Sequence, residues 1–178
     1  MLEPVKDMLR RQSLKKNAST EPTGFVPLEK IHSAVAFIDV EDTSYDECKL
    51  LIQAFFRENN MKGDIFFLDF KKLGDGERLI TSITGTILKK DLNWFGRPSR
   101  EKMDILLGCK TDLFISLLNN TDFPLEIMAS ASKAKFKIGR RQLPGNIFDM
   151  VISDPADKNL SEAESFLAMK SYLNRIQG

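Results

Sequence analysis

Short runs of almost wholly apolar residues recur along this 178-residue chain, and they constrain its fold more than any other feature. Residues 33–39 read SAVAFID, and residues 112–118 read DLFISLL. Runs of this length without alternation are typical of strands that are buried on both faces, as in a parallel sheet covered by helices. Segments with apolar residues at helical spacing lie between the runs. The chain therefore predicts an α/β fold.

The order of the expected elements indicates the architecture. After the first strand, Ser44 and Glu47 form a capping-box pattern that predicts a helix to about residue 59. Ser161 and Glu164 repeat this pattern before the last helix. Further strands are expected at 64–70, 112–118, 133–138 and 147–152, and further helices at 99–108 and 125–132. Strands that alternate with helices predict a three-layer, Rossmann-like sandwich with a mainly parallel sheet.

Two segments stand apart from this alternation. Residues 79–88 are rich in β-branched side chains and are expected to be extended, with their place in the sheet left open, and Gly74-Asp75-Gly76 before them is expected to be a turn. Residues 1–30 are expected to form a basic helix and a linker before a single α/β domain at 31–178. The helix at 2–16 has the charge to lie on an anionic membrane surface. Because its apolar face is short and lacks bulky aromatics, a helix that is solvated or packed against the domain is the favoured interpretation.

Composition excludes several classes of function. The net charge is +1, no apolar run approaches the length of a bilayer span, and no signal-peptide pattern is present, so we expect a cytoplasmic protein. Cys48 and Cys109 stand alone, which predicts neither a disulfide framework nor a zinc site. The only histidine, His32, precedes the first strand and is badly placed for a catalytic triad. No dinucleotide or phosphate-loop glycine motif occurs, and we expect no metal and no cofactor.

Polar residues follow the expected strands at their carboxyl ends, where ligands bind in open parallel sheets. They mix acids, amides and arginines, and the ligand-binding candidates are Asp39, Asp42, Thr43, Asn119, Asn120, Arg140 and Arg141. Carboxylates there could act as a general base, and the paired arginines could bind a phosphate or carboxylate. The same residue types are what helix caps and turns require, and that alternative stays open.

A row of lysines lies on one face of the expected strand at 133–138. Lys133, Lys135 and Lys137 alternate with apolar residues, and two arginines continue the row. The row is either a track for an anionic partner or a device that protects an exposed edge strand from pairing. Because the net charge is near zero and aromatic residues are few, we expect no nucleic acid.

The only tryptophan lies in the stretch KKDLNWFGRPS at 89–99. Trp94 and Phe95 are expected to be the last apolar groups before a turn made by Gly96 and Pro98. The favoured interpretation is that both rings are buried and fasten this connection to the core. The alternative is that they form an exposed anchor for a partner protein.

Three stretches, NWFG at 93–96, TDLFI at 111–115 and SKAKFKIG at 132–139, resemble a small bacterial α/β family known only as a domain of unknown function. The resemblance covers nearly the whole chain and implies no activity. The order of DLFISL and KFKIGR is also similar to the amino-terminal half of heptosyltransferase-like glycosyltransferases. That resemblance implies a Rossmann-like acceptor domain, but this chain is too short for the second domain, and residues 39–43 lack the family's glycine.

These observations favour a non-catalytic, cytoplasmic, Rossmann-like domain that binds a partner protein or a small anion. One alternative is an enzyme that uses Asp39, Asp42 and Arg140 on a phosphorylated or sugar-like substrate. Another is peripheral membrane association through residues 2–16. The oligomeric state stays open.

Overall fold

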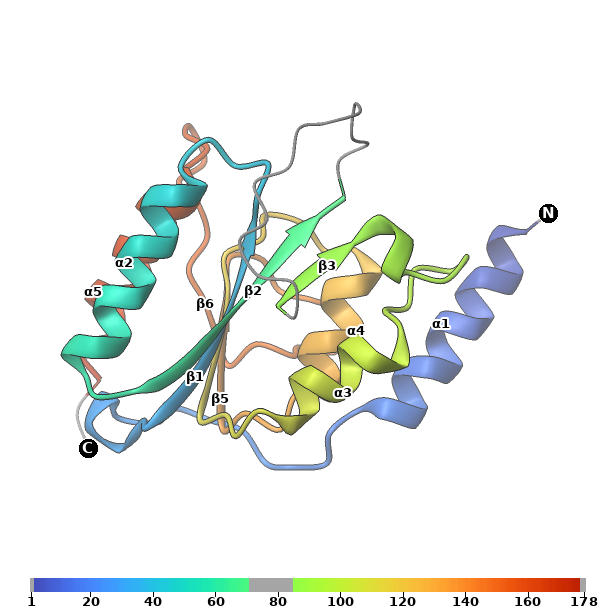
Figure 1. The fold of residues 1–178 in the computed structure, drawn as a ribbon, viewed down its shortest axis with the longest axis horizontal. Helices are drawn as coiled ribbons and strands as arrows, with labels where there is room; N and C mark the ends of the chain where they lie inside the picture. Colours follow the sequence, from blue (N-terminus) through green and yellow to red (C-terminus); the bar gives the residue numbers. More distant parts are fainter. Residues whose placement is uncertain (1, 71–84, 177–178) are drawn as a thin grey trace.

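The sheet has the strand order of a doubly wound fold. A computed structural model describes residues 2–70 and 85–176, and within them six parallel strands pair in the order β3-β2-β1-β4-β5-β6 (Figure 1). The strands are β1 (Ser33–Asp39), β2 (Lys62–Asp69), β3 (Thr86–Leu88), β4 (Leu113–Ser116), β5 (Phe136–Gly139) and β6 (Met150–Val151). The order reverses between β1 and β4, as in Rossmann-like proteins. The predicted fold class is confirmed.

Helices cover both faces of this sheet. The helices are α1 (Glu3–Asn17), α2 (Tyr45–Glu58), α3 (Arg100–Gly108), α4 (Phe123–Ala131) and α5 (Glu162–Leu173), with short 3-10 turns at Leu28–Lys30 and Lys89–Asp91. α2 and α5 pack together on one face, and α3 and α4 lie on the other (Figure 1). α1 packs on the outer side of α4. No helix in the described ranges is long and apolar enough to cross a bilayer.

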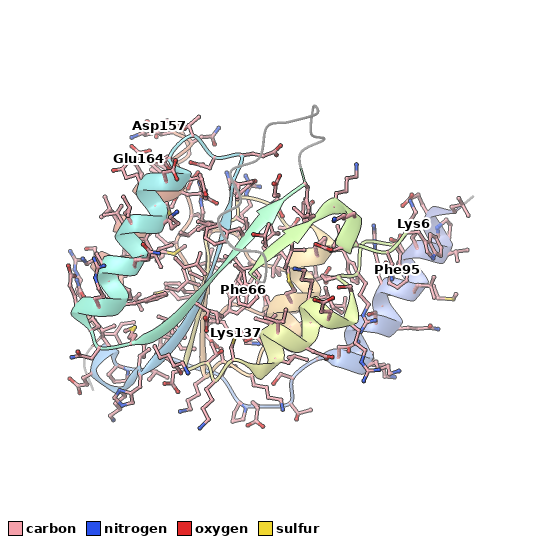
Figure 2. All side chains as sticks on the ribbon, in the orientation of Figure 1. Lys6, Phe66, Phe95, Lys137, Asp157 and Glu164 are labelled. Carbon is pink, nitrogen blue, oxygen red and sulfur yellow. The ribbon has the colours of Figure 1, made fainter. Side chains whose placement is uncertain are left out.

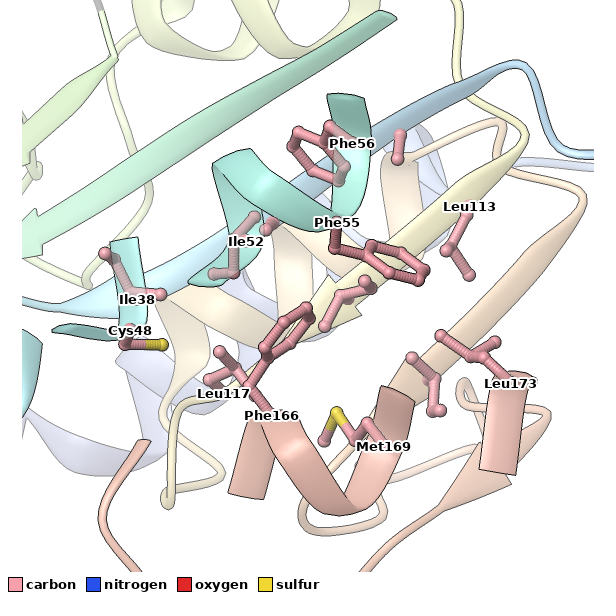
Figure 3. Close-up of a cluster of buried hydrophobic side chains, with 14 of the residues drawn as sticks. Ile38, Cys48, Ile52, Phe55, Phe56, Leu113, Leu117, Phe166, Met169 and Leu173 are labelled. Atoms are coloured by element: carbon pink, nitrogen blue, oxygen red, sulfur yellow. The ribbon is translucent and has the colours of Figure 1, made fainter. Parts of the chain in front are cut away.

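Aromatic side chains fill the layers on both sides of the sheet. On one side, the Phe55 ring of α2 meets the Phe166 ring of α5 edge-on at 5.6 Å (Figure 3). On the other side, the Phe37 ring of β1 stacks between Phe66 of β2 at 5.1 Å and Phe114 of β4 at 5.0 Å. Burying a phenylalanine side chain stabilises a fold by roughly 1.5–3 kcal/mol. These ring contacts therefore stabilise the packing of β1 against β2 and β4, and of α2 against α5.

The capping box predicted at Ser44 is wrong. Ser44 precedes α2, but its side chain makes no capping bond to that helix. Its hydroxyl instead donates to Asp42 Oδ1 at 2.7 Å and accepts from the backbone N–H of Ala163 at 3.0 Å, in the first turn of α5. The capping box at Ser161 and Glu164 is confirmed. The two sites have the same Ser-x-x-Glu spacing. They differ because α5 lies close to Ser44 and supplies the N–H group that its hydroxyl binds.

The prediction that lysines protect β5 as an edge strand is also wrong. β5 lies between β4 and β6, so neither of its edges is free. Lys133 and Lys135 are exposed, but Lys137 is buried beneath α4, where its Nζ donates to the carbonyl of Ala129 at 2.7 Å (Figure 2). The expected row of bases is therefore interrupted at its third lysine.

The favoured interpretation of the tryptophan is wrong for Trp94, whose side chain is 56% exposed. Trp94 and Phe95 are themselves the central residues of the turn, because the N–H of Gly96 donates to the carbonyl of Asn93 at 2.9 Å. Gly96 has φ of +94°, which favours glycine at that position. Only Phe95 packs inward, with its ring 6.3 Å from that of Phe123 on α4.

The segment between α1 and β1 is held against the domain at several points. The N–H of Ser19 donates to the carbonyl of Ser130, the N–H of Gly24 donates to that of Lys135, and the Phe25 ring meets Phe136 edge-on at 5.5 Å. Residues 85–88 of the extended segment expected at 79–88 lead into and form β3, beside β2. The rest of that segment, 79–84, and the turn expected at 74–76 lie outside the described residues.

Candidate functional site

Asp39 at the end of β1 and Asp42 in the loop that follows lie at the reversal of strand order, but their carboxylates bind backbone N–H groups of a turn and of helix ends. Asp42 accepts from the N–H of Ser44 at 2.8 Å and from the N–H of Glu162 at 3.3 Å. Asp39 accepts from the N–H of Glu41 at 2.9 Å, and its burial raises the pKa of its carboxyl above the usual range. Asp42 thus ties the β1 loop to the first turn of α5.

Arg140 is buried and has partners inside the domain. Its Nη2 contacts both carboxylate oxygens of Asp154, at 3.0 and 2.7 Å, and the carbonyl of Leu160 at 2.8 Å. Its Nη1 donates to the carbonyl of Leu117 at 3.0 Å. Only 2% of the residue is exposed. The guanidinium therefore joins the ends of β4 and β5 to the loop before α5, and it presents no open fork to a ligand.

The other predicted ligand-binding residues divide into pairs and turns. The Arg141 Nε donates to the Asn119 amide oxygen at 2.7 Å, and this pair is exposed to solvent. Asn120 accepts from the N–H of Asp122 at 3.0 Å, just before α4, and Thr43 is exposed in the β1 loop. The structure brings Arg141 together with Asn119, while Arg140 points inward to a different set of groups.

Glu162 is the polar group at this edge that sequence reasoning missed. It is 1% exposed, and its Oε1 accepts from the N–H of Asp39 at 2.7 Å. The pKa of Glu162 is raised to about 9, chiefly by burial and to a smaller extent by the nearby Asp42 and Asp39 carboxylates. The sequence pattern at 161–164 predicts a capping box, but it does not predict that Glu162, inside this pattern, faces β1. Within the described ranges, no three His, Cys, Asp or Glu side chains are grouped to hold a metal ion.

Burial shifts the pKa of two thiols and one lysine amine in the described part of the chain. Burial raises the pKa of the Cys48 thiol well above its usual range and that of the Cys109 thiol to about 11. Burial lowers the pKa of Lys137 to about 8, but its amine is under α4 and bonded to a helix carbonyl. A thiol with a raised pKa is a poor nucleophile at neutral pH. None of these groups is placed for covalent chemistry.

A cavity of about 760 Å³ lies at the carboxyl edge of the sheet, on the side that α4 covers. Its walls come from segments that follow four strands: Phe70 after β2, Lys89 after β3, Asp122 at the start of α4 after β4, and Pro144 after β5. α1 forms the outer wall, and the cavity is open to solvent. The cavity has the volume of a small-molecule site and the position that such sites occupy in parallel sheets.

Within residues 2–70 and 85–176, some of the basic side chains around the cavity are paired with carboxylates, and others are not. Arg10, Arg11 and Lys89 line it together with three carboxylates. Asp7 lies 3.6 Å from Arg10 and offsets part of its charge. Burial raises the pKa of the Glu126 carboxyl above its usual range. Arg11 and Lys89 are exposed, and no carboxylate of the described residues lies within ion-pair distance of either.

Arg10 fastens α1 at this place. Its Nε donates to the carbonyl of Phe95 at 2.8 Å, and its guanidinium lies 5.4 Å above the centre of the Phe123 ring. No residue of α1 is fully buried. Sequence reasoning placed the arginines of α1 on a separate basic helix. The only sequence pattern that marks these arginines is their position on one side of the helix. Their contact with α4 joins residues more than a hundred positions apart, so no local pattern predicts it.

The strand order and the helices on both faces define a Rossmann-like α/β domain, with a cavity at the carboxyl edge of its sheet. A family model matches residues 6–176, and the chain belongs to the family of unknown function DUF6913. No curated protein and no solved structure matches the chain. These comparisons support neither the resemblance to heptosyltransferase-like enzymes nor a bacterial origin.

Proposed function

We propose that this chain is a non-catalytic binding domain that takes up a small organic anion in the cavity between α1 and α4. The supporting observation is the lining of that cavity by Arg10, Arg11 and Lys89 at the carboxyl edge of a parallel sheet. The first turn of α4 also lines it, and the amino end of a helix favours negative charge. Arginine and lysine are the side chains that best bind carboxylates and phosphates.

The apolar part of the lining favours an anion with an apolar body over an inorganic ion. Leu14, Phe70 and Pro144 contribute carbon surface to the same cavity as the three basic residues. A bare phosphate would leave that surface in contact with water, whereas an aryl or alkyl group would cover it. A carboxylate or phosphate monoester attached to such a group therefore fits both parts of the lining.

The alternative functions have less support. An enzyme that relies on Asp39, Asp42 and Arg140 requires side chains that already bind helix ends and an internal carboxylate. A partner protein that contacts Trp94 and Phe95 remains a prediction, and Phe95 is only partly accessible. Binding without catalysis requires only the charges and the carbon surface of the cavity.

The proposal is tested by thermal unfolding in the presence of benzoate, hexanoate, phenyl phosphate or inorganic phosphate at constant ionic strength. A probe present at ten times its Kd stabilises the folded state by about 1.4 kcal/mol. That stabilisation raises the midpoint of a domain of this size by about 3 to 6 °C. We expect benzoate, hexanoate or phenyl phosphate to raise it, and inorganic phosphate to raise it less.

Matched variants locate the binding site. Arg11→Gln with Lys89→Gln removes two exposed charges from the cavity, and we expect it to abolish the rise. Lys133→Gln with Lys135→Gln removes two exposed charges elsewhere and should preserve it. The proposal is wrong if no organic anion raises the midpoint of the wild-type protein, or if the cavity variant keeps the full rise.

A further inference from the structure

Two segments far apart in the sequence form one end of the molecule, which we call the α1 end: residues 2–17 and residues 89–100. The Arg10 Nε of α1 donates to the carbonyl of Phe95, so the Trp94 turn lies against the helix (Figures 1 and 2). Large apolar side chains are exposed here. Leu2, Val5 and Met8 keep 66, 41 and 51% of their surface accessible, and Trp94 keeps 56%.

The α1 end is basic although the chain as a whole is nearly neutral. By sequence it has nine Lys and Arg residues against three acids, whereas the rest of the chain has seventeen against twenty-two. Its acids are engaged locally: Glu3 pairs with Lys6 at 2.7 Å, Asp7 lies near Arg10, and Asp91 accepts from the N–H of Leu88 at 2.8 Å. The protein is thus strongly polarised, with its positive charge at the end that exposes apolar groups.

The Trp94 turn is held in shape by hydrogen bonds. Asn93 Oδ1 accepts from the N–H groups of Phe95 and Arg97, at 3.2 and 2.9 Å, and the N–H of Asn93 donates to the carbonyl of Arg97 at 2.9 Å. Leu92 and Pro98 pair across the base of the turn. Phe95 packs inward, so the Trp94 ring is presented to solvent by a fixed backbone.

We propose that the α1 end binds the surface of an anionic lipid bilayer. A basic helix with exposed apolar side chains binds in the headgroup region, through attraction to anionic lipids and burial of its carbon surface. Tryptophan is enriched at that interface because its ring is amphipathic. α1 alone lacks an aromatic residue, and the tertiary structure supplies one by placing the Trp94 turn beside it. A nucleic acid would use the positive charge but would leave Leu2, Val5 and Met8 without partners.

The proposal does not depend on ligand binding in the cavity, and vesicles test it directly. The full chain is sedimented with phosphatidylcholine vesicles that contain or lack phosphatidylglycerol. We expect binding only when the anionic lipid is present, with weaker binding as salt is added. Trp94 is the only tryptophan, so its emission reports the contact. It should shift to shorter wavelength when anionic vesicles are added.

Variants distinguish binding by the α1 end from non-specific adsorption of the protein to vesicles. Lys15→Glu with Lys16→Glu should weaken binding at least about tenfold, because it reverses two exposed charges near the bilayer. Trp94→Ala should also weaken it, whereas Tyr172→Ala, at an exposed aromatic residue on α5, should not. Circular dichroism checks that each variant is folded. The proposal is overturned if the wild-type protein ignores anionic vesicles, binds neutral vesicles equally, or if the charge-reversed variant binds as the wild type does.

Discussion

The carboxylate of Glu162 on α5 accepts a hydrogen bond from the backbone N–H of Asp39, 2.7 Å away at the end of β1. This bond joins two residues that are 123 positions apart in the sequence. The other carboxylate oxygen, Oε2, is buried and has no hydrogen-bond partner among the described residues. An uncharged carboxyl group suits this environment, since burial and two neighbouring acids disfavour its ionised form.

Glu162→Gln should therefore change the pH dependence of stability. The pKa of Glu162 is about 9 in the folded protein, compared with the ordinary value of 4.5 expected in the unfolded chain. Between these two pH values the folded state keeps a proton that the unfolded chain releases. The stability that this group contributes is full below pH 4.5 and is lost as the pH rises toward 9. Glutamine does not ionise. Since one pKa unit corresponds to about 1.4 kcal/mol, we expect the variant to gain up to about 4 kcal/mol of stability relative to the wild type between pH 5 and pH 8.

Urea titrations of both proteins between pH 5 and pH 8 measure this difference. Glu29→Gln, at an exposed glutamate, is the matched control and should follow the wild-type curve. Parallel curves for the wild type and Glu162→Gln would show that Glu162 is ionised in the folded protein.

Arg140→Met should destabilise the fold by about 3 kcal/mol. The substitution leaves Asp154 without its cationic partner and removes the donor to the carbonyl of Leu117. Arg141→Met, at the exposed neighbour, should cost less than about 0.5 kcal/mol. Guanidinium chloride unfolding of the two variants gives the comparison. Equal losses would contradict the assignment of Arg140 as an internal link.

Trp94 and Phe95 should respond in opposite ways to truncation. Because Trp94 is exposed, acrylamide should quench its fluorescence readily, and Trp94→Ala should change the free energy of unfolding by less than about 0.5 kcal/mol. Phe95→Ala should cost about 1 kcal/mol or more, since its ring packs on Phe123. A protected Trp94 emission, or a larger loss from Trp94→Ala than from Phe95→Ala, would contradict the described turn.

Gly139→Ala should destabilise the protein by about 1–3 kcal/mol. A Cβ atom at this position would overlap the Phe148 ring, which is itself buried and has little room to move. Gly108→Ala is the control, because a Cβ at the end of α3 meets nothing within 4 Å. There alanine should be neutral or mildly stabilising. Thermal unfolding of both variants distinguishes a packed position from an open one.

Local patterns predicted most of the elements and the class of the fold. The apolar runs at β1 and β4 and the capping box at Ser161 depend on neighbours in sequence, and the structure confirms them. Patterns whose meaning depends on a distant partner were misread. Ser44 has the spacing of a capping box but bonds to α5, and Lys137 has the polarity of a surface residue but lies beneath α4.

Short-range patterns were enough to predict a mainly parallel α/β sheet covered by helices, because strand burial and helix spacing are encoded over a few residues. They also placed polar residues at the carboxyl edge. Which of those side chains face solvent and which bind one another, as Arg140 does with Asp154, depends on how distant parts of the chain pack together. The same holds for α1, whose Arg10 and Arg11 reach the cavity because the helix packs on α4. Such contacts join residues distant along the chain, and short-range periodicity contains no information about them.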